Sequence, residues 1–368
     1  MNKHKKTYLF VLYIFISIVT FGQNEINNSK YYFGGININN GYVWPHTSRV
    51  YYIKANAIEV QAKIYVNLKN TSDWINPFKA TKFGYSLTYI KTDNLIPNII
   101  TRDKSQLGTI YGLNMFLEPM LFSYKRVHLY AHLGAGIAYA SERYNRVNND
   151  SNLLISTPLS FFFNGKINLD YELTKKISVG LNFGMSHCSN AALNLPNLGL
   201  NVVNYGLNFG YKIFSQEQQP IVNLKINPFW EKNISIGYAT RNCNENIDKY
   251  YHVYTLDFEL NHHLNRKNAI SFNLNYLLRQ GEMLDKTFNS TYNSYYGFAI
   301  GHELFIKKLS LISQLGEYIF DTNQNKHFWY ARLGVRYYFL PNLYSSILLT
   351  NRKQSADLLQ LSFGFSFK

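Results

Sequence analysis

A histidine and a serine stand two residues apart in the segment Met185-Ser186-His187-Cys188-Ser189-Asn190. Residues two apart on a β-strand share one face. Upstream of this pair, the positions of the same parity are all apolar: Ile177, Val179, Leu181, Phe183 and Met185. A histidine that takes the proton of a serine hydroxyl makes that hydroxyl a nucleophile toward esters. The pattern therefore predicts hydrolytic chemistry on a lipid-facing surface.

A third polar residue, Asn201, continues this face on the next predicted strand, where odd positions are apolar and even positions small or polar. We expect it beside His187, where a third group could hold the imidazole in the required tautomer. Amides of the intervening loop could stabilise an oxyanion. The alternative is that these are ordinary polar residues at the end of a strand, because short motifs of this kind often occur by chance.

Alternating hydrophobicity and turn residues predict about sixteen strands, and hence an all-β antiparallel barrel of the outer-membrane type. The predicted strands are 31–40, 57–66, 82–92, 107–122, 126–141, 157–173, 176–189, 201–214, 232–242, 250–264, 268–280, 293–306, 308–320, 327–340, 343–352 and 357–368. Short and long connections alternate, as periplasmic turns and outer loops do in bacterial barrels. Two connections, 67–81 and 215–231, break this alternation.

The last predicted strand has alternate aromatic residues, which resembles the terminal strand read by the barrel-insertion machinery. Gly206-Leu207-Asn208-Phe209-Gly210-Tyr211 echoes Leu361-Ser362-Phe363-Gly364-Phe365. This echo leaves open two eight-stranded units. We favour one closed barrel, since a single closed sheet leaves no strand edge unpaired.

Composition narrows the class of protein further. Residues 1–22 have a basic start and an apolar stretch, which indicates a signal peptide, and leave 23–368 for the barrel. The chain has 31 tyrosines and 26 phenylalanines but only two cysteines, so it is neither a disulfide scaffold nor a cysteine-based metal site. Its net charge of +15 is scattered over turns and loops, which argues against nucleic-acid binding and favours contact with anionic lipid headgroups.

The motif His187-x-Ser189-Asn190-Ala191, followed by Pro196-Asn197-x-Gly199-Leu200, resembles that of the lipid A 3-O-deacylase (PagL-like) family. It looks closest to the longer members known as acyloxyacyl hydrolases, which Phe33-Gly34-Gly35 and Gly41-Tyr42-x-x-Pro45-His46 also fit. The similar region spans about 31–213, and an extension of about 219–368 follows it. The short members of the family carry a glutamate where this chain has Asn201.

The resemblance implies an outer-membrane serine esterase that removes an acyl chain from the lipid A of lipopolysaccharide, without a metal or other cofactor. On that pattern Ser189 is the nucleophile and His187 the general base, while Asn197, with Asn190, matches the oxyanion region. Asn201 would orient the histidine without contributing a charge, or another acid such as Glu59 or Glu142 would serve. A homodimer is compatible with this class. The alternatives are a passive pore and a structural or adhesive barrel.

Overall fold

The computed structural model describes residues 29–53, 55–67, 82–92, 96–97, 104–191, 193–217, 227–244, 247–280, 292–306, 308–321, 328–352 and 355–367. The predicted signal peptide lies outside these residues. Within them, no helix is long and apolar enough to cross a bilayer. The chain divides into two compact units, one made of residues 1–190 with 198–223 and the other of residues 191–197 with 224–368.

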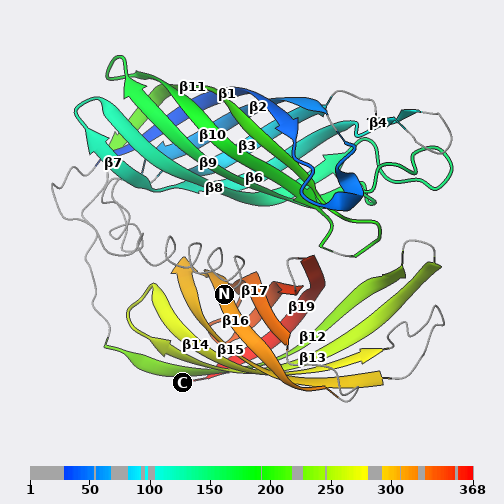
Figure 1. Cartoon of the computed structure of the whole chain (residues 1–368). Coiled ribbons are helices and arrows are strands. Elements are labelled where there is room, and N and C mark those ends of the chain that lie inside the picture. Colours follow the sequence, from blue (N-terminus) through cyan, green and yellow to red (C-terminus); the bar gives the residue numbers. More distant parts are fainter. Residues whose placement is uncertain are drawn as a thin grey trace, which may run out of the picture. The chain divides into compact units, whose positions relative to one another are not determined.

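The first unit is a closed antiparallel barrel of eight strands (Figure 1). Their order around the barrel is β6-β3-β2-β1-β11-β10-β9-β8, and β6 pairs with β8 to close it. The bounds are β1 Ser29–Val43, β2 Asn56–Asn67, β3 Lys82–Thr92, β6 Thr109–Glu118, β8 Val127–Ala140, β9 Leu159–Glu172, β10 Ile177–Ser189 and β11 Leu200–Glu217. A short 3-10 helix, η1 (Ser48–Val50), follows β1, and a small pair, β4 (Ile96–Pro97) with β5 (Lys104–Ser105), lies between β3 and β6.

One predicted strand, 107–122, is interrupted. It is divided into β6 and β7 (Met120–Tyr124), both of which pair with β8. Pro119 stands at the break and has no backbone N–H to give to the ladder. Its carbonyl still accepts a bond from the Ala131 N–H, so the two pieces follow one line along the barrel wall.

The second unit is also a closed barrel, formed by β12 to β19 in chain order. Its last strand pairs with its first, which closes this sheet as well. The bounds are β12 Phe229–Asn244, β13 Ile247–His263, β14 Asn268–Gln280, β15 Tyr292–Ile306, β16 Leu309–Asp321, β17 Phe328–Tyr338, β18 Leu343–Arg352 and β19 Ser355–Phe367.

The sixteen strands therefore agree with the prediction, but our preference for a single barrel was wrong. Strand β11 pairs with β1 over the whole length of β1, which leaves β11 no free edge for β12. The echo between 206–211 and 361–365 has a structural counterpart, because β11 and β19 are the closing strands of the two barrels. The irregular connection 215–231 is the passage from one barrel to the other, and residues 68–81 lie outside the described part.

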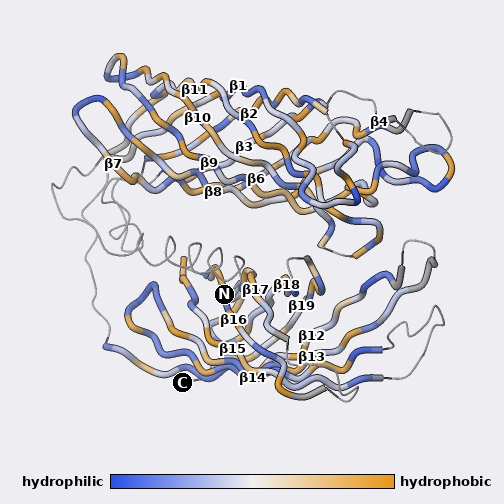
Figure 2. The backbone as a smooth tube through the Cα atoms, viewed as in Figure 1, coloured by the Kyte–Doolittle hydropathy of each residue, from blue (hydrophilic) through white to orange (hydrophobic). Residues whose placement is uncertain are grey.

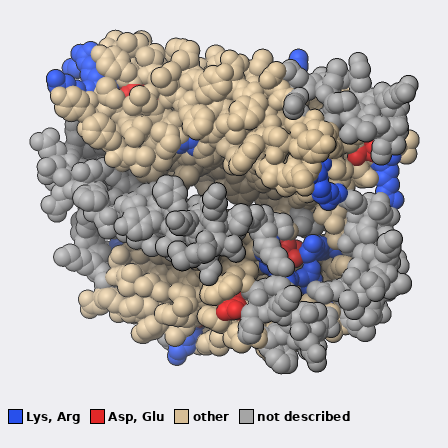
Figure 3. All heavy atoms as spheres, in the orientation of Figure 1, with Lys and Arg blue, Asp and Glu red and all other residues tan. Residues whose placement is uncertain are grey.

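The walls of both barrels are apolar outside and polar inside. Figure 2 shows the matching alternation of hydrophobic and hydrophilic residues along the strands. In β10, Leu181 and Phe183 are 58% and 62% exposed, whereas Asn182 and Ser186 are 4% and 1% exposed. On the face seen in Figure 3, the described barrel walls carry few charged atoms. This period of two places every odd residue of β10, including His187 and Ser189, on the outer face.

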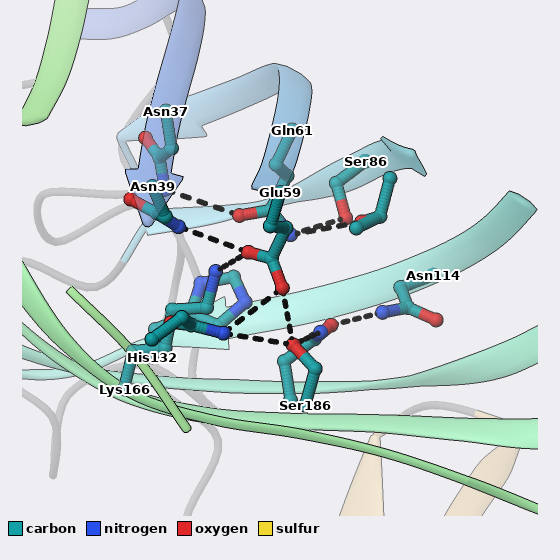
Figure 4. Close-up of polar contacts among 12 residues, drawn as sticks. Asn37, Asn39, Glu59, Gln61, Ser86, Asn114, His132, Lys166 and Ser186 are labelled. Atoms are coloured by element: carbon teal, nitrogen blue, oxygen red, sulfur yellow. Dashed lines mark hydrogen bonds and ion pairs between the residues drawn. The ribbon is translucent and has the colours of Figure 1, made fainter. Parts of the chain in front are cut away.

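The interior of the first barrel is filled by hydrogen-bonded polar side chains. Glu59 of β2 pairs with Lys166 of β9, and also accepts bonds from Asn39 at 2.9 Å, Ser186 at 2.5 Å and Asn204 at 3.0 Å (Figure 4). The Glu59 and Lys166 side chains are 1% and 0% exposed. An eight-stranded barrel is just wide enough for its side chains to fill. The cluster therefore acts as a core for this barrel and supports β10 through Ser186.

Candidate functional site

The site lies at one rim of the first barrel, where two adjacent strands end and begin. His187 and Ser189 are the last outward-facing residues of β10, and Asn201 is the second residue of β11. In the antiparallel register His187 stands directly opposite Asn201. The alternation predicted from the sequence has thus brought the three residues to one place on the outer face.

The distances join these side chains into a chain of hydrogen bonds. Ser189 Oγ lies 2.9 Å from His187 Nε2, and Asn201 Oδ1 lies 2.6 Å from His187 Nδ1. Both are within the range required of a base and of the group that orients it. Ser189 and His187 are half-buried, and Asn201 is 8% exposed. The arrangement can therefore take a proton from a serine hydroxyl that remains accessible.

A second histidine completes the row of side chains. His46 lies three residues beyond β1, the strand on the other side of β11. Its Nδ1 is 2.8 Å from Asn201 Nδ2, and its Nε2 is 2.8 Å from the carbonyl oxygen of Leu198. The sequence contained His46 in a segment similar to the family but gave no reason to place it at the site. That placement depends on the closure of the barrel, which sets β1 beside β11.

The loop before β11 is held by backbone bonds to the connection between β8 and β9. The Leu198 N–H donates to the Leu153 carbonyl at 3.1 Å, and the Gly199 N–H donates to that of Leu154 at 3.0 Å. On the same connection, Ser151 O accepts a bond from the Tyr52 hydroxyl at 3.1 Å. Burial raises the pKa of Tyr52, which favours the protonated hydroxyl as this donor.

Gly199 is a position that only glycine satisfies. Its φ is +80°, and a β-carbon there would lie 2.7 Å from His187 Cε1. The backbone therefore passes directly against the imidazole ring, and Phe163 lies on a neighbouring strand with its ring centroid 6.4 Å away. These contacts restrict the ring to the orientation in which Nε2 meets the serine.

An apolar cluster of buried side chains lies at this end of the barrel. It includes residues from the rim connections and from the inward positions of β10 and β11, and its members are Val43, Val50, Ile53, Ala55, Ala57, Ile90, Leu107, Ile110, Ala138, Ala140, Leu154, Ile155, Phe162, Cys188, Leu200 and Val202. Cys188 belongs to this interior, 1% exposed, and so does not share the face of Ser189. The cluster provides rigid packing beneath the strands that carry the site.

The two asparagines predicted for the oxyanion region have different surroundings. Asn190 is 1% exposed, and its Nδ2 donates to Ser156 Oγ at 2.9 Å. Asn197 is half-buried in segment 191–197, which is grouped with the second unit, so its position relative to Ser189 is not described.

The two acids that we considered as replacements for the family's glutamate do not bond the histidine ring, because Ser189 and Asn201 hold both of its nitrogens. Glu59 lies in the interior and bonds Ser186 instead. Asn201 itself therefore occupies the orienting position. Across the described residues, no group of three or more histidine, cysteine, aspartate or glutamate side chains is arranged to hold a metal ion.

A closed β-barrel with an apolar outer wall places the chain in the class of outer-membrane β-barrel proteins. This barrel carries a row of serine, histidine and asparagine side chains at one rim. Comparison with known families then assigns the family. The lipid A 3-O-deacylase (PagL) model matches residues 61–212, and the model of the acyloxyacyl hydrolase C-terminal domain matches residues 228–368. Each barrel thus contains one of the matched regions. The chain belongs to the lipid A 3-O-deacylase family, in the form that carries this C-terminal domain.

Other comparisons add little. No curated protein matches the chain. Among solved structures, Acinetobacter baumannii OccAB4 is 11% identical, with 94% of this chain and 99% of that chain covered and a TM-score of 0.22. An outer membrane channel from Pseudomonas putida is also 11% identical, with 95% and 98% covered and a TM-score of 0.21. With TM-scores this low, neither likeness bears on the site or on the function.

Proposed function

We propose that this protein is an outer-membrane esterase that removes an ester-linked acyl chain from lipid A. The observation that carries the proposal is the pair of short contacts of His187, 2.9 Å to Ser189 Oγ and 2.6 Å to Asn201 Oδ1, on the outer face of the barrel. The family assignment supports lipid A as the substrate. The apolar walls and the closure of each barrel, by pairing of β6 with β8 and of β12 with β19, support a place in a bilayer.

The proposed reaction has two steps. Ser189 Oγ attacks the ester carbonyl carbon while its proton passes to His187 Nε2, and the carbonyl oxygen becomes an oxyanion. Collapse breaks the bond to the sugar oxygen, which takes the proton from His187 and leaves an acyl-serine. Water then attacks this ester with His187 again as base, and a fatty acid is released. Asn197 is our candidate for a hydrogen bond to the oxyanion, because the Nδ2 group of Asn190 is buried and donates to Ser156.

The position of the site suits an acyl substrate. His187 and Ser189 continue a column of exposed apolar residues on β10, so an acyl chain lying along the wall would present its ester at the rim. In this proposal the rim with the long connections faces the cell exterior, where lipopolysaccharide occupies the outer leaflet. The Asn201 amide orients His187 but supplies no charge to stabilise the imidazolium.

The pore alternative is disfavoured by the filled interiors. In the first barrel Glu59 and Lys166 are fully enclosed, and in the second Arg336 bonds Glu259 at 2.7 Å and Glu303 at 3.0 Å with all three side chains at most 5% exposed. A lumen blocked by such bonded charges leaves little room for a water-filled path.

Lipid A composition tests the proposal. In cells that express the protein, we expect mass spectrometry of lipid A to show species lighter by one acyl chain, and these should be absent when His187→Ala is expressed at the same level. Unchanged lipid A with the wild-type protein, together with ion conductance in planar bilayers, would favour the pore instead. Equal acyl loss with the wild-type protein and His187→Ala would refute the assigned base.

A further inference from the structure

In the row of hydrogen bonds from His46 to Ser189, each bond has a defined donor and acceptor. The backbone carbonyl of Leu198 determines these roles. The carbonyl oxygen of Leu198 can only accept, so the His46 Nε2 that lies 2.8 Å away must carry the hydrogen. In neutral His46, Nδ1 is then an acceptor, and the Asn201 atom 2.8 Å from it must be the donor Nδ2. Asn201 Oδ1 is therefore turned to His187, whose Nδ1 donates to it. His187 Nε2 is left as the acceptor for the Ser189 hydroxyl.

One further contact of His46 favours the opposite tautomer, but it is long. The carbonyl oxygen of Trp44 lies 3.4 Å from His46 Nδ1, at the limit of a hydrogen bond. The opposite tautomer would gain only this long contact. It would also set an unprotonated Nε2 against the Leu198 carbonyl, and two acceptors at 2.8 Å repel each other. The two short bonds therefore decide the tautomer.

An asparagine at position 201 needs a second partner such as His46 to fix the orientation of its amide, whereas a carboxylate does not. Both oxygens of a carboxylate accept, so either orientation holds a histidine with its Nδ1 protonated. An amide presents an oxygen on one side and an NH₂ group on the other. If the Asn201 amide turned over, its NH₂ group would face His187 Nδ1, and the hydrogen would move to Nε2. That tautomer cannot take the proton of Ser189.

We propose that His46 is a positioning residue that fixes the orientation of the Asn201 amide, and through it the tautomer of His187 that activates Ser189. This inference rests on the proposed function. It links His187 and Ser189 of β10, Asn201 of β11 and His46, which follows β1, and it explains how the site operates with an amide in place of an acid. The tautomer is set by Leu198, a part of the loop itself.

Rescue by Asn201→Asp tests the inference. With purified full-length protein in detergent micelles containing lipid A, we expect His46→Ala to lower kcat by about tenfold, the worth of one hydrogen bond, with KM nearly unchanged. In the Asn201→Asp background the same His46→Ala change should lower kcat by less than about twofold, because either oxygen of the carboxylate can accept the bond from His187 Nδ1. His302→Ala is the matched control, since His302 also bonds an asparagine, Asn268 at 2.9 Å, but in the second barrel.

The tautomer itself supplies a second readout that does not depend on activity. The ¹⁵N shifts of His187, in protein labelled at histidine, should report hydrogen on Nδ1 in the wild type and a mixture of tautomers in His46→Ala. Equal losses of activity from His46→Ala in both backgrounds would mean that His46 only braces the loop. An unchanged tautomer in His46→Ala would also overturn the inference.

These outcomes are distinct from failure of the proposed function. If lipid A is not cleaved at all, or if it is cleaved as fast by Ser189→Ala, the proposed function fails. If Ser189→Ala is inactive but His46→Ala retains full activity, only the role of His46 fails.

Discussion

Ser189→Ala is expected to lower kcat for release of fatty acid from lipid A by about four orders of magnitude or more, the scale seen when a nucleophilic serine is removed. The substitution deletes one half-buried hydroxyl whose partner is His187 Nε2, at 2.9 Å. Because both side chains of this bond are only half-buried, the stability of the barrel should change by less than about 0.5 kcal/mol. The rate is measured with purified protein, and stability by thermal unfolding in detergent.

Ser186→Ala is the matched control for this prediction. Ser186 lies on the same strand but faces the interior, where its hydroxyl donates to Glu59 at 2.5 Å. Its loss should leave the rate within a few-fold of the wild type while lowering stability by about 1–3 kcal/mol, since a buried carboxylate loses one donor. The opposite pattern, an inactive Ser186→Ala and an active Ser189→Ala, would place the chemistry on the wrong face of β10.

Lys166→Met is expected to cause a large loss of stability in the first barrel. It removes the ion-pair partner of Glu59 while both side chains are at most 1% exposed, and an unpaired buried charge of this kind costs about 3–5 kcal/mol. Circular dichroism during heating in detergent should show an earlier transition for the first barrel. Replacing both partners, as Glu59→Gln with Lys166→Met, should recover most of the loss, because no charge is then left unpaired.

A matched substitution in the second barrel shows which thermal unfolding transition belongs to which barrel. Arg332 bonds Asp257 at 2.8 Å, and the two side chains are 1% and 5% exposed. Arg332→Met should therefore lower a transition of the second barrel and leave that of the first in place. A single transition that both variants lower equally would show that the two barrels unfold together. An unchanged midpoint in Lys166→Met would show that the ion pair does not hold the barrel.

Local sequence patterns were sufficient to predict the strands and the faces of the site residues. Alternation put His187 and Ser189 on the outer face, and the structure has them there, with Cys188 between them packed inside. Asn201 was predicted beside His187 because both strands keep the same parity across one loop, and the register pairs them directly. Such inferences need only a period of two and one neighbouring strand.

Closure of the sheet could not be predicted in the same way. Whether β11 pairs with β1 or with β12 depends on contacts between strands far apart in the sequence, and alternation is the same in either case. This dependence on distant strands explains both why a single barrel was wrongly predicted and why His46 was not placed at the site. His46 reaches Asn201 only when β1 lies next to β11. The echo between the two closing strands was the available signal.

In the proposed reaction Ser189, activated by His187, is the nucleophile that attacks an acyl ester. A long-chain alkyl fluorophosphonate, which bonds covalently to activated serines, tests it most directly when the labelled protein is digested and analysed by mass spectrometry. We expect one adduct, on Ser189, formed in step with loss of lipid A cleavage and strongly slowed in His187→Ala. Complete loss of activity with the label on another residue, or full lipid A cleavage after Ser189 has been labelled, would contradict it.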